Sequence, residues 1–166
     1  MDILLGYLNS KSINDAGKST LVDILLGLLT PGSGQVIVDG NPVDLATASW
    51  QSEAGYVPQD IFLIDDTIRR NITFGIRDNE ISETQILKSI EVAQLTKFIG
   101  TLPKGLDTIT GERGVRLSGG QRQRIGIARA IYHEPSLLVL DEARPVPSIL
   151  TPRASSSRLS KPSITS

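Results

Sequence analysis

The sequence predicts an α/β fold in which a helical subdomain is inserted into a core with a buried parallel strand. Leu137 to Leu140 is a continuous apolar run, as expected of a central parallel strand with both faces covered. Residues 17–29 carry an amphipathic helical pattern, and helical patterns also run from Gln59 to Ile131. Together these segments indicate an α/β domain.

Length and composition allow one domain and exclude several classes of function. The 166 residues are 39% hydrophobic, enough for one core, and the formal net charge of −1 gives no sign of a basic nucleic-acid surface. The absence of cysteine excludes disulfides and thiolate metal sites and favours a reducing compartment. The longest apolar stretch, Leu21 to Leu29, is interrupted by Asp23 and is too short to span a bilayer. We therefore expect any membrane role to depend on a partner or on a segment outside this sequence.

The first helix is expected over residues 17–29, where Pro31-Gly32 would stop it. The sequence Asp2 to Gly6 recurs as Asp23 to Gly27 inside this helix. One short copy is not a solenoid repeat, so it indicates a local duplication or a sequence artefact. On this interpretation the first segment resembles a copied piece of helix.

Two short strands are expected before the helical region. Gln35 to Val38 alternates in polarity and ends in an Asp39-Gly40 turn, while Gly55 to Val57 is a strand end closed by Pro58.

Two Ser-x-x-Gln segments predict helix starts, because a serine hydroxyl and a glutamine side chain three residues later can form a capping box. Residues 82–85 and residues 118–121 have this form. In the helix that starts after Ser82, the apolar residues Ile86, Ile90 and Ala93 share one face. In the helix that starts after Ser118, Ile125, Ala128 and Ile131 do so. Pro135 ends the helical region.

A phosphate-binding loop is indicated by Gly17-Lys18-Ser19-Thr20 ahead of the first helix. Backbone N–H groups at a helix start bind phosphate, Lys18 supplies positive charge to the outer phosphates, and Ser19 ligates magnesium. These four residues also occur by chance. The preceding part departs from the pattern, since Ser12 stands where its first glycine is usual, and Asp15 brings a carboxylate into the loop. A carboxylate about 4 Å from a phosphate would weaken phosphate binding by roughly 4 kcal/mol at an effective dielectric of about 20.

Two carboxylates follow the apolar strand. Asp141 would lie at the carboxyl edge of the sheet, where it can hold magnesium through water, and Glu142 would act as general base for the attacking water. Alone, the pattern also fits a core strand that ends in a solvated acidic turn. Combined with the phosphate-binding loop, the catalytic interpretation is favoured.

The most specific segment is Leu117 to Arg124. Two glycines after the Ser118 cap leave the first N–H groups of a helix uncovered, ready for the γ-phosphate of a nucleotide held by another subunit. A plain capped helix requires no particular residues after its cap.

These motifs resemble, in order and spacing from Gly17 to Ala143, the nucleotide-binding domain of ABC transporters of the exporter type. The segments that carry the resemblance are the signature motif and its helix at Leu117 to Ala130, the Q-loop at Tyr56 to Gln59, the X-loop at Gly111 to Gly114 and an exporter-type segment at Asp66 to Ile72. The resemblance implies a partial P-loop NTPase core of the ABC type over residues 1–143, with the helical subdomain at about 59–130.

The resemblance also implies ATP and Mg²⁺ as cofactors and assigns roles to residues of this chain. It places the nucleotide against Asp15, Ala16, Gly17, Lys18, Ser19 and Thr20 and, from another copy, against Ser118, Gly119, Gly120 and Gln121. The metal residues are Ser19, Gln59 and Asp141, and the catalytic residues are Glu142 and Gln59.

The implied partners are a second ATP-binding domain, paired head to tail, and the transmembrane domain of an exporter. ATP hydrolysis at the cytoplasmic face of the membrane would then drive export, with no nucleic acid involved. A soluble ABC ATPase acting on DNA or ribosomes is a rival, but Glu112 in the X-loop argues against it. A catalytically inactive fragment is the second rival.

The second rival is favoured by four departures from the family pattern: Ser12, Asp15, the missing D-loop and the missing switch histidine. The resemblance also implies an aromatic residue that stacks on adenine, upstream of the phosphate-binding loop, and we expect it to lie outside the given sequence. The lone histidine, His133, precedes the strand that the switch histidine should follow, and we expect it to be a surface residue at a helix end. Arg144 to Pro147 does not resemble the D-loop.

The segment Arg144 to Ser166 is rich in serine and proline, lacks acidic residues and predicts a disordered tail. Synonymous codons exist for which a frame beginning on the last base of the Arg144 codon encodes Thr-Ser-Ala-Leu-Asp, the expected D-loop, followed by an amphipathic helix. We interpret the tail as a frameshift product, and its coding nucleotides would decide this.

Overall fold

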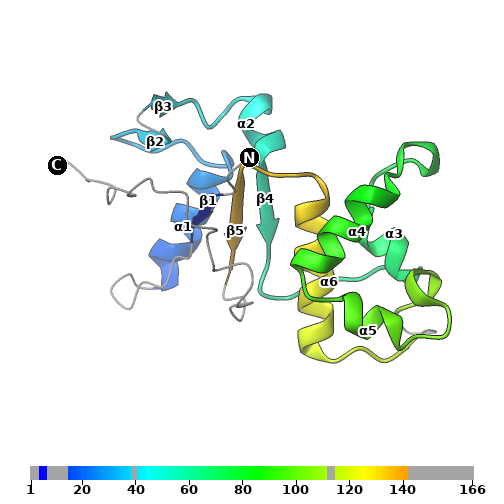
Figure 1. Ribbon diagram of the computed structural model, residues 1–166. Helices are drawn as coiled ribbons and strands as arrows, with labels where there is room; N and C mark the ends of the chain where they lie inside the picture. The colour runs from blue at the N-terminus through cyan, green and yellow to red at the C-terminus, as the bar shows by residue number, and fades with distance from the viewer. Residues whose placement is uncertain (1–3, 7–14, 39–40, 112–114, 142–166) are drawn as a thin grey trace, which may run out of the picture.

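The computed structural model describes residues 4–6, 15–38, 41–111 and 115–141. Their strands and the first two helices form one lobe, and helices α3 to α6 form the other (Figure 1). The predicted α/β class is confirmed. Residues 144–166, for which a disordered tail is predicted, lie outside the described residues.

The sheet contains three parallel strands, β1 (Leu4–Gly6), β5 (Leu137–Leu140) and β4 (Ala54–Val57), in the order β1-β5-β4. Leu137 is in register with Leu4 on one side and with Ala54 on the other. The predictions of a strand end at Gly55 to Val57 and of a central strand at Leu137 to Leu140 are confirmed.

Residues Leu4 to Gly6 are extended and not helical, while the duplication inferred for this segment stays a prediction. These residues pair with β5 as strand β1. Of the matching residues 25–27, only Leu25 lies within α1, as its last residue. The same three residue types form a strand here, because pairing with β5 overrides local preference.

Strand β5 separates two apolar cores, since alternate residues of a strand point to opposite faces. Leu138 and Leu140 pack with Val57 and the residues of the helical lobe. Leu137 and Val139 pack on the other face, with Val22 of α1 and with Leu45 and Trp50.

Helix α1 (Asp15–Leu25) ends earlier than predicted. Gly27 has a φ of 70°, and the N–H groups of Leu28 and Gly27 donate to the carbonyls of Asp23 (2.8 Å) and Ile24 (2.9 Å). This is a Schellman motif, which stops the helix before Pro31-Gly32 is reached. A Cβ at Gly27 would lie 2.0 Å from the Leu45 carbonyl oxygen, so only glycine fits there.

Helix α2 (Ala48–Glu53) holds the carboxyl end of α1. The indole nitrogen of the buried Trp50 donates to the Leu25 carbonyl at 2.8 Å, and the Gln51 amide donates to the Gly27 carbonyl at 3.2 Å. Nearby, β2 (Val36–Val38) and β3 (Asn41–Val43) form an antiparallel pair. The strand predicted at Gln35 to Val38 is therefore confirmed, while the Asp39-Gly40 turn lies outside the described residues.

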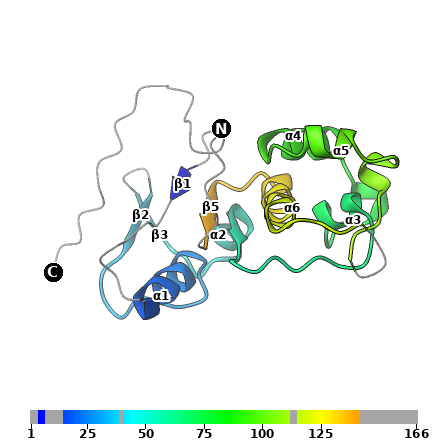
Figure 2. The same cartoon turned by 90° about the horizontal axis from the view of Figure 1, so that it is seen from below.

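The second lobe is helical. Its elements are α3 (Ile68–Ile72), η1 (Asp78–Glu80), α4 (Glu83–Val92), α5 (Thr96–Gly100), η2 (Gly105–Asp107) and α6 (Gly119–Tyr132). Helices α3 and α4 both pack against α6 (Figure 2). Their core contains fully buried side chains such as Ile68, Ile86 and Ile125.

The two predicted capping boxes differ. At α6, the Ser118 hydroxyl accepts from the Gln121 N–H (3.2 Å) and the Gln121 side chain accepts from the Ser118 N–H (2.7 Å), so this box is confirmed. At α4, the Ser82 hydroxyl accepts from the Gln85 N–H, but the Ser82 N–H donates to the Tyr132 hydroxyl at 2.9 Å. A tertiary contact replaces half of this box.

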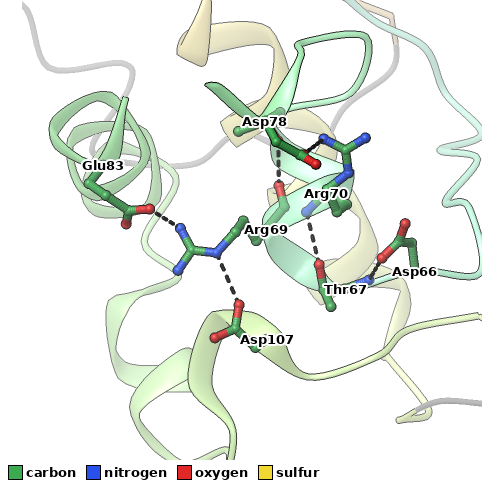
Figure 3. A network of polar contacts seen from close by, with 8 residues as sticks. Asp66, Thr67, Arg69, Arg70, Asp78, Glu83 and Asp107 are labelled. Atoms are coloured by element: carbon green, nitrogen blue, oxygen red, sulfur yellow. Dashed lines mark hydrogen bonds and ion pairs between the residues drawn. The ribbon is translucent and has the colours of Figure 1, made fainter. Parts of the chain in front are cut away.

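Arginine side chains connect α3 to the segments around it (Figure 3). Arg69 forms ion pairs with Glu83 and, at 3.0 Å, with Asp107, whose hydrogen bond is the main cause that raises the Arg69 pKa. Arg70 pairs with Asp78 at 2.7 Å. These contacts fix the exporter-type segment within the helical lobe.

Candidate functional site

The candidate site lies at the carboxyl edge of the parallel sheet. Gly6, Val57 and Leu140 end their strands at this edge, and Asp141 follows directly. The Asp141 N–H donates to the Val57 carbonyl at 3.0 Å, which fixes the end of β5 to the end of β4. In open parallel sheets, ligands bind outside this edge.

Helix α1 supplies the predicted phosphate-binding residues. Asp15 and Ala16 are its first two residues, Gly17 is partly buried, and Ser19 and Thr20 in its first turns are exposed. The helix follows β1, so its start belongs to the carboxyl edge that also carries Asp141. Gln59 is exposed two residues beyond the end of β4.

Tyr56, the first residue of the Q-loop segment, was assigned no role from the sequence, but it contacts Asp141, one of the three predicted metal residues. Its phenol donates to Oδ2 of Asp141 at 3.2 Å. Burial raises the Tyr56 pKa, and the charge and hydrogen bond of Asp141 and the charge of Asp23 raise it further.

The described donors fit magnesium. Ser19, Gln59 and Asp141 offer hydroxyl, amide and carboxylate oxygens, the atoms that Mg²⁺ prefers. Within the described ranges no group of three or more His, Cys, Asp or Glu residues could form a dedicated metal cage. A single carboxylate suits Mg²⁺ in particular, because this ion keeps several waters and takes other ligands from substrate phosphates.

The start of α6 offers a second phosphate-binding surface. Ser118, Gly119 and Gly120 are exposed, and a Cβ added at either glycine would meet no atom within 4 Å. Intramolecular packing therefore does not require glycine here. Figures 1 and 2 show the start of α6 well apart from α1, so one copy does not bring Ser118 to Gln121 together with its own Ser19.

Several predicted residues lie away from the site or outside the described part. His133 is exposed at the carboxyl end of α6, as predicted. The predicted base Glu142 and X-loop residues 112–114 lie outside the described residues, as does the Lys18 side chain.

Gly111, the first residue of the X-loop segment, has a φ of 97°, and a Cβ there would lie 2.7 Å from an Asp65 carboxylate oxygen. Among the described helices, none has the length and apolarity to cross a membrane.

Comparisons with known proteins agree with this arrangement. Residues 13–144 match the ABC transporter family. The chain is 42% identical over 130 residues to an ATP-dependent lipid A-core flippase of Ralstonia nicotianae, covering 77% of this chain and 22% of the flippase. A multidrug resistance ABC transporter ATP-binding and permease protein of Lactococcus lactis is 39% identical over 128 residues, covering 76% and 22%.

A solved structure gives the same result. The structure of a bacterial Atm1-family ABC exporter with ATP bound matches with a TM-score of 0.66 and 37% identity, covering 81% of this chain and 24% of the exporter. The chain thus spans about a fifth of the curated relatives named above. The predicted resemblance and its P-loop NTPase fold of the ABC type are confirmed. The chain therefore belongs to the ABC transporter family.

Proposed function

We propose that this chain binds MgATP as the nucleotide-binding domain of an ABC exporter, whose hydrolysis of ATP drives transport across a membrane. The observation that carries the proposal is the placement of the α1 start, Asp141 and Gln59 at one edge of the parallel sheet. Relatives described as a lipid A-core flippase and a multidrug transporter support export as the process.

The proposed roles follow from the donor at each position. Backbone N–H groups from Asp15 to Thr20 hold the phosphates together with the Lys18 ammonium. Ser19, Gln59 and Asp141 hold Mg²⁺, which neutralises phosphate charge when it is bound. Gln59 orients the attacking water, and Glu142 accepts its proton.

A second copy would complete the site. The open space around Gly119 and Gly120, and their separation from α1 of the same copy, support a head-to-tail pair in which the start of one α6 meets the nucleotide of the other copy. A transmembrane partner would contact the helical lobe and hold the chain at the cytoplasmic face of the membrane.

A nucleotide-binding fragment without turnover is the second candidate. Asp15 as the first residue of α1 favours it, because a carboxylate at the helix start repels phosphate. Ser12 and the segment Arg144 to Pro147 are further departures from the pattern of active members.

Fluorescent ATP titrated into the chain with and without Mg²⁺ tests the proposal. We expect Mg²⁺-dependent binding that Lys18→Ala abolishes, whereas Lys97→Ala on the exposed surface of α5 leaves it unchanged. Equal binding by the Lys18→Ala variant would contradict the phosphate-binding role.

Phosphate release compared with a Glu142→Gln control separates the two candidates. A hydrolysing domain should release phosphate above this control. The fragment should only equal the control, because positioning dominates phosphoryl transfer. Phosphate release that the Glu142→Gln substitution abolishes would exclude the second candidate, a nucleotide-binding fragment without turnover.

A further inference from the structure

Tyr56 and Asp141 contact each other diagonally across neighbouring strands. Tyr56 is in register with Val139, and residues in register share a face of the sheet. Asp141 follows Val139 by two residues and therefore lies on that same face. The distance between diagonal neighbours suits an aromatic side chain, and the Tyr56 oxygen lies 3.2 Å from Oδ2 of Asp141.

This face of the sheet is the one that α1 covers. Val139 packs in the same core as Val22 of α1, and the charge of Asp23, also on α1, acts on the Tyr56 phenol. The helix that carries Ser19 therefore lies on the side of the sheet where Tyr56 contacts the carboxylate.

We infer that Tyr56 is a positioning residue for magnesium, because its hydroxyl holds the Asp141 carboxylate in one orientation through Oδ2, and Oδ1 would then serve the ion that the site would hold. This inference rests on the proposed MgATP-binding function. The phenol suits this task because it donates a hydrogen bond without adding a positive charge that would compete with the metal. A lysine at the same place would lower the attraction of Asp141 for Mg²⁺.

The test is the Mg²⁺ dependence of fluorescent ATP binding by the full chain. Tyr56→Phe removes one oxygen atom and keeps the ring. Tyr132→Phe is the matched control, since its hydroxyl also makes one hydrogen bond, to the Ser82 N–H in the helical lobe. We expect Tyr56→Phe to raise the half-maximal Mg²⁺ concentration about two- to tenfold, the effect of one lost hydrogen bond. Binding in EDTA should not change, and Tyr132→Phe should match the unmodified chain.

A double-mutant cycle separates positioning from a merely structural effect. In an Asp141→Asn background, Tyr56→Phe should cause no further change in Mg²⁺ dependence, because the carboxylate that it positions is gone. The same fold-change in both backgrounds would overturn the inference, as would an unchanged Mg²⁺ midpoint in Tyr56→Phe alone. If the unmodified chain shows no Mg²⁺-dependent nucleotide binding, the proposed function itself fails, and the inference fails with it.

Discussion

Arg129 of α6 holds Asn71 of α3 at two points, by a hydrogen bond of 2.8 Å from Nε to the backbone carbonyl and one of 3.2 Å from Nη2 to the side-chain oxygen. Its Nη1 also donates to the Phe62 carbonyl at 3.2 Å, and its guanidinium lies 5.3 Å from the Phe74 ring centroid. Burial lowers the pKa of Arg129. These contacts connect the chain that follows Gln59 to helix α6, which begins at Gly119.

Asn71→Ala should destabilise the chain by about 2–3 kcal/mol, because the fully buried amide satisfies several groups that would lose their partner. Its amide nitrogen donates to the Thr110 hydroxyl and the Ile64 carbonyl, both at 3.0 Å, and its oxygen accepts from the Ile64 N–H. Urea denaturation gives the free energy of unfolding. Asn79→Ala, at an exposed position, is the control. A loss equal to that of the control would contradict the assigned role of the amide.

Two glycines on α6 should respond to alanine in opposite ways. A Cβ at Gly126 would lie 2.6 Å from Cδ1 of Ile61, so Gly126→Ala should cost about 1–2 kcal/mol of stability. A Cβ at Gly120 would meet nothing within 4 Å, so Gly120→Ala should be neutral or stabilise the helix by up to about 1 kcal/mol. The midpoints of urea unfolding distinguish the two variants, and a loss of stability in Gly120→Ala would show that its glycine serves packing.

Replacing Ser12 and Asp15 by glycine should tighten ATP binding. The change restores backbone freedom in the phosphate-binding loop and removes a negative charge from the start of α1. Isothermal titration calorimetry measures the affinity. Glu53→Gln, at the exposed end of α2, removes the same charge elsewhere and should have little effect. Equal affinity in the doubly substituted and unmodified chains would show that these residues do not impair the site.

The acid stability of the chain should depend partly on Glu134. A hydrogen bond from Lys88 and a second one from Gln85 lower its pKa below the ordinary 4.5. A lowered pKa contributes stability that is present above the ordinary value and is lost as pH falls through the lowered one. Glu134→Gln should therefore flatten the fall in urea midpoint between neutral pH and about pH 3, and Lys88→Met should do the same. Parallel curves for Glu134→Gln and the unmodified chain would refute this.

Local patterns predicted the elements whose determinants are close in sequence. The strand at Leu137 to Leu140 and the Ser118 box follow from adjacent residues, and both are confirmed. The Schellman motif at Gly27 could also have been predicted from its glycine, but the apolar pattern continues to Leu29 and led to a helix end that is too late. The proposed boundaries of the helical subdomain stay a prediction.

Contacts between distant residues could not be read from the sequence. Tyr132 replaces half of the Ser82 box from 50 residues away, and the Tyr56 hydroxyl reaches Asp141 across 85 residues. Arg129 reaches Asn71 across 58 residues. Each pair depends on how strands and helices pack, which periodicity does not encode.

The position of β5 between two apolar cores determines how cooperatively the chain unfolds. Leu138 and Leu140 belong to the core of the helical lobe, and Leu137 and Val139 to the core beneath α1. If either core melted, one face of the shared strand would be exposed to water while the other face still held it in place. That intermediate would keep the cost of ordering the strand and lose half of the burial that offsets this cost. The two cores should therefore melt together, in one cooperative transition rather than in two separate steps.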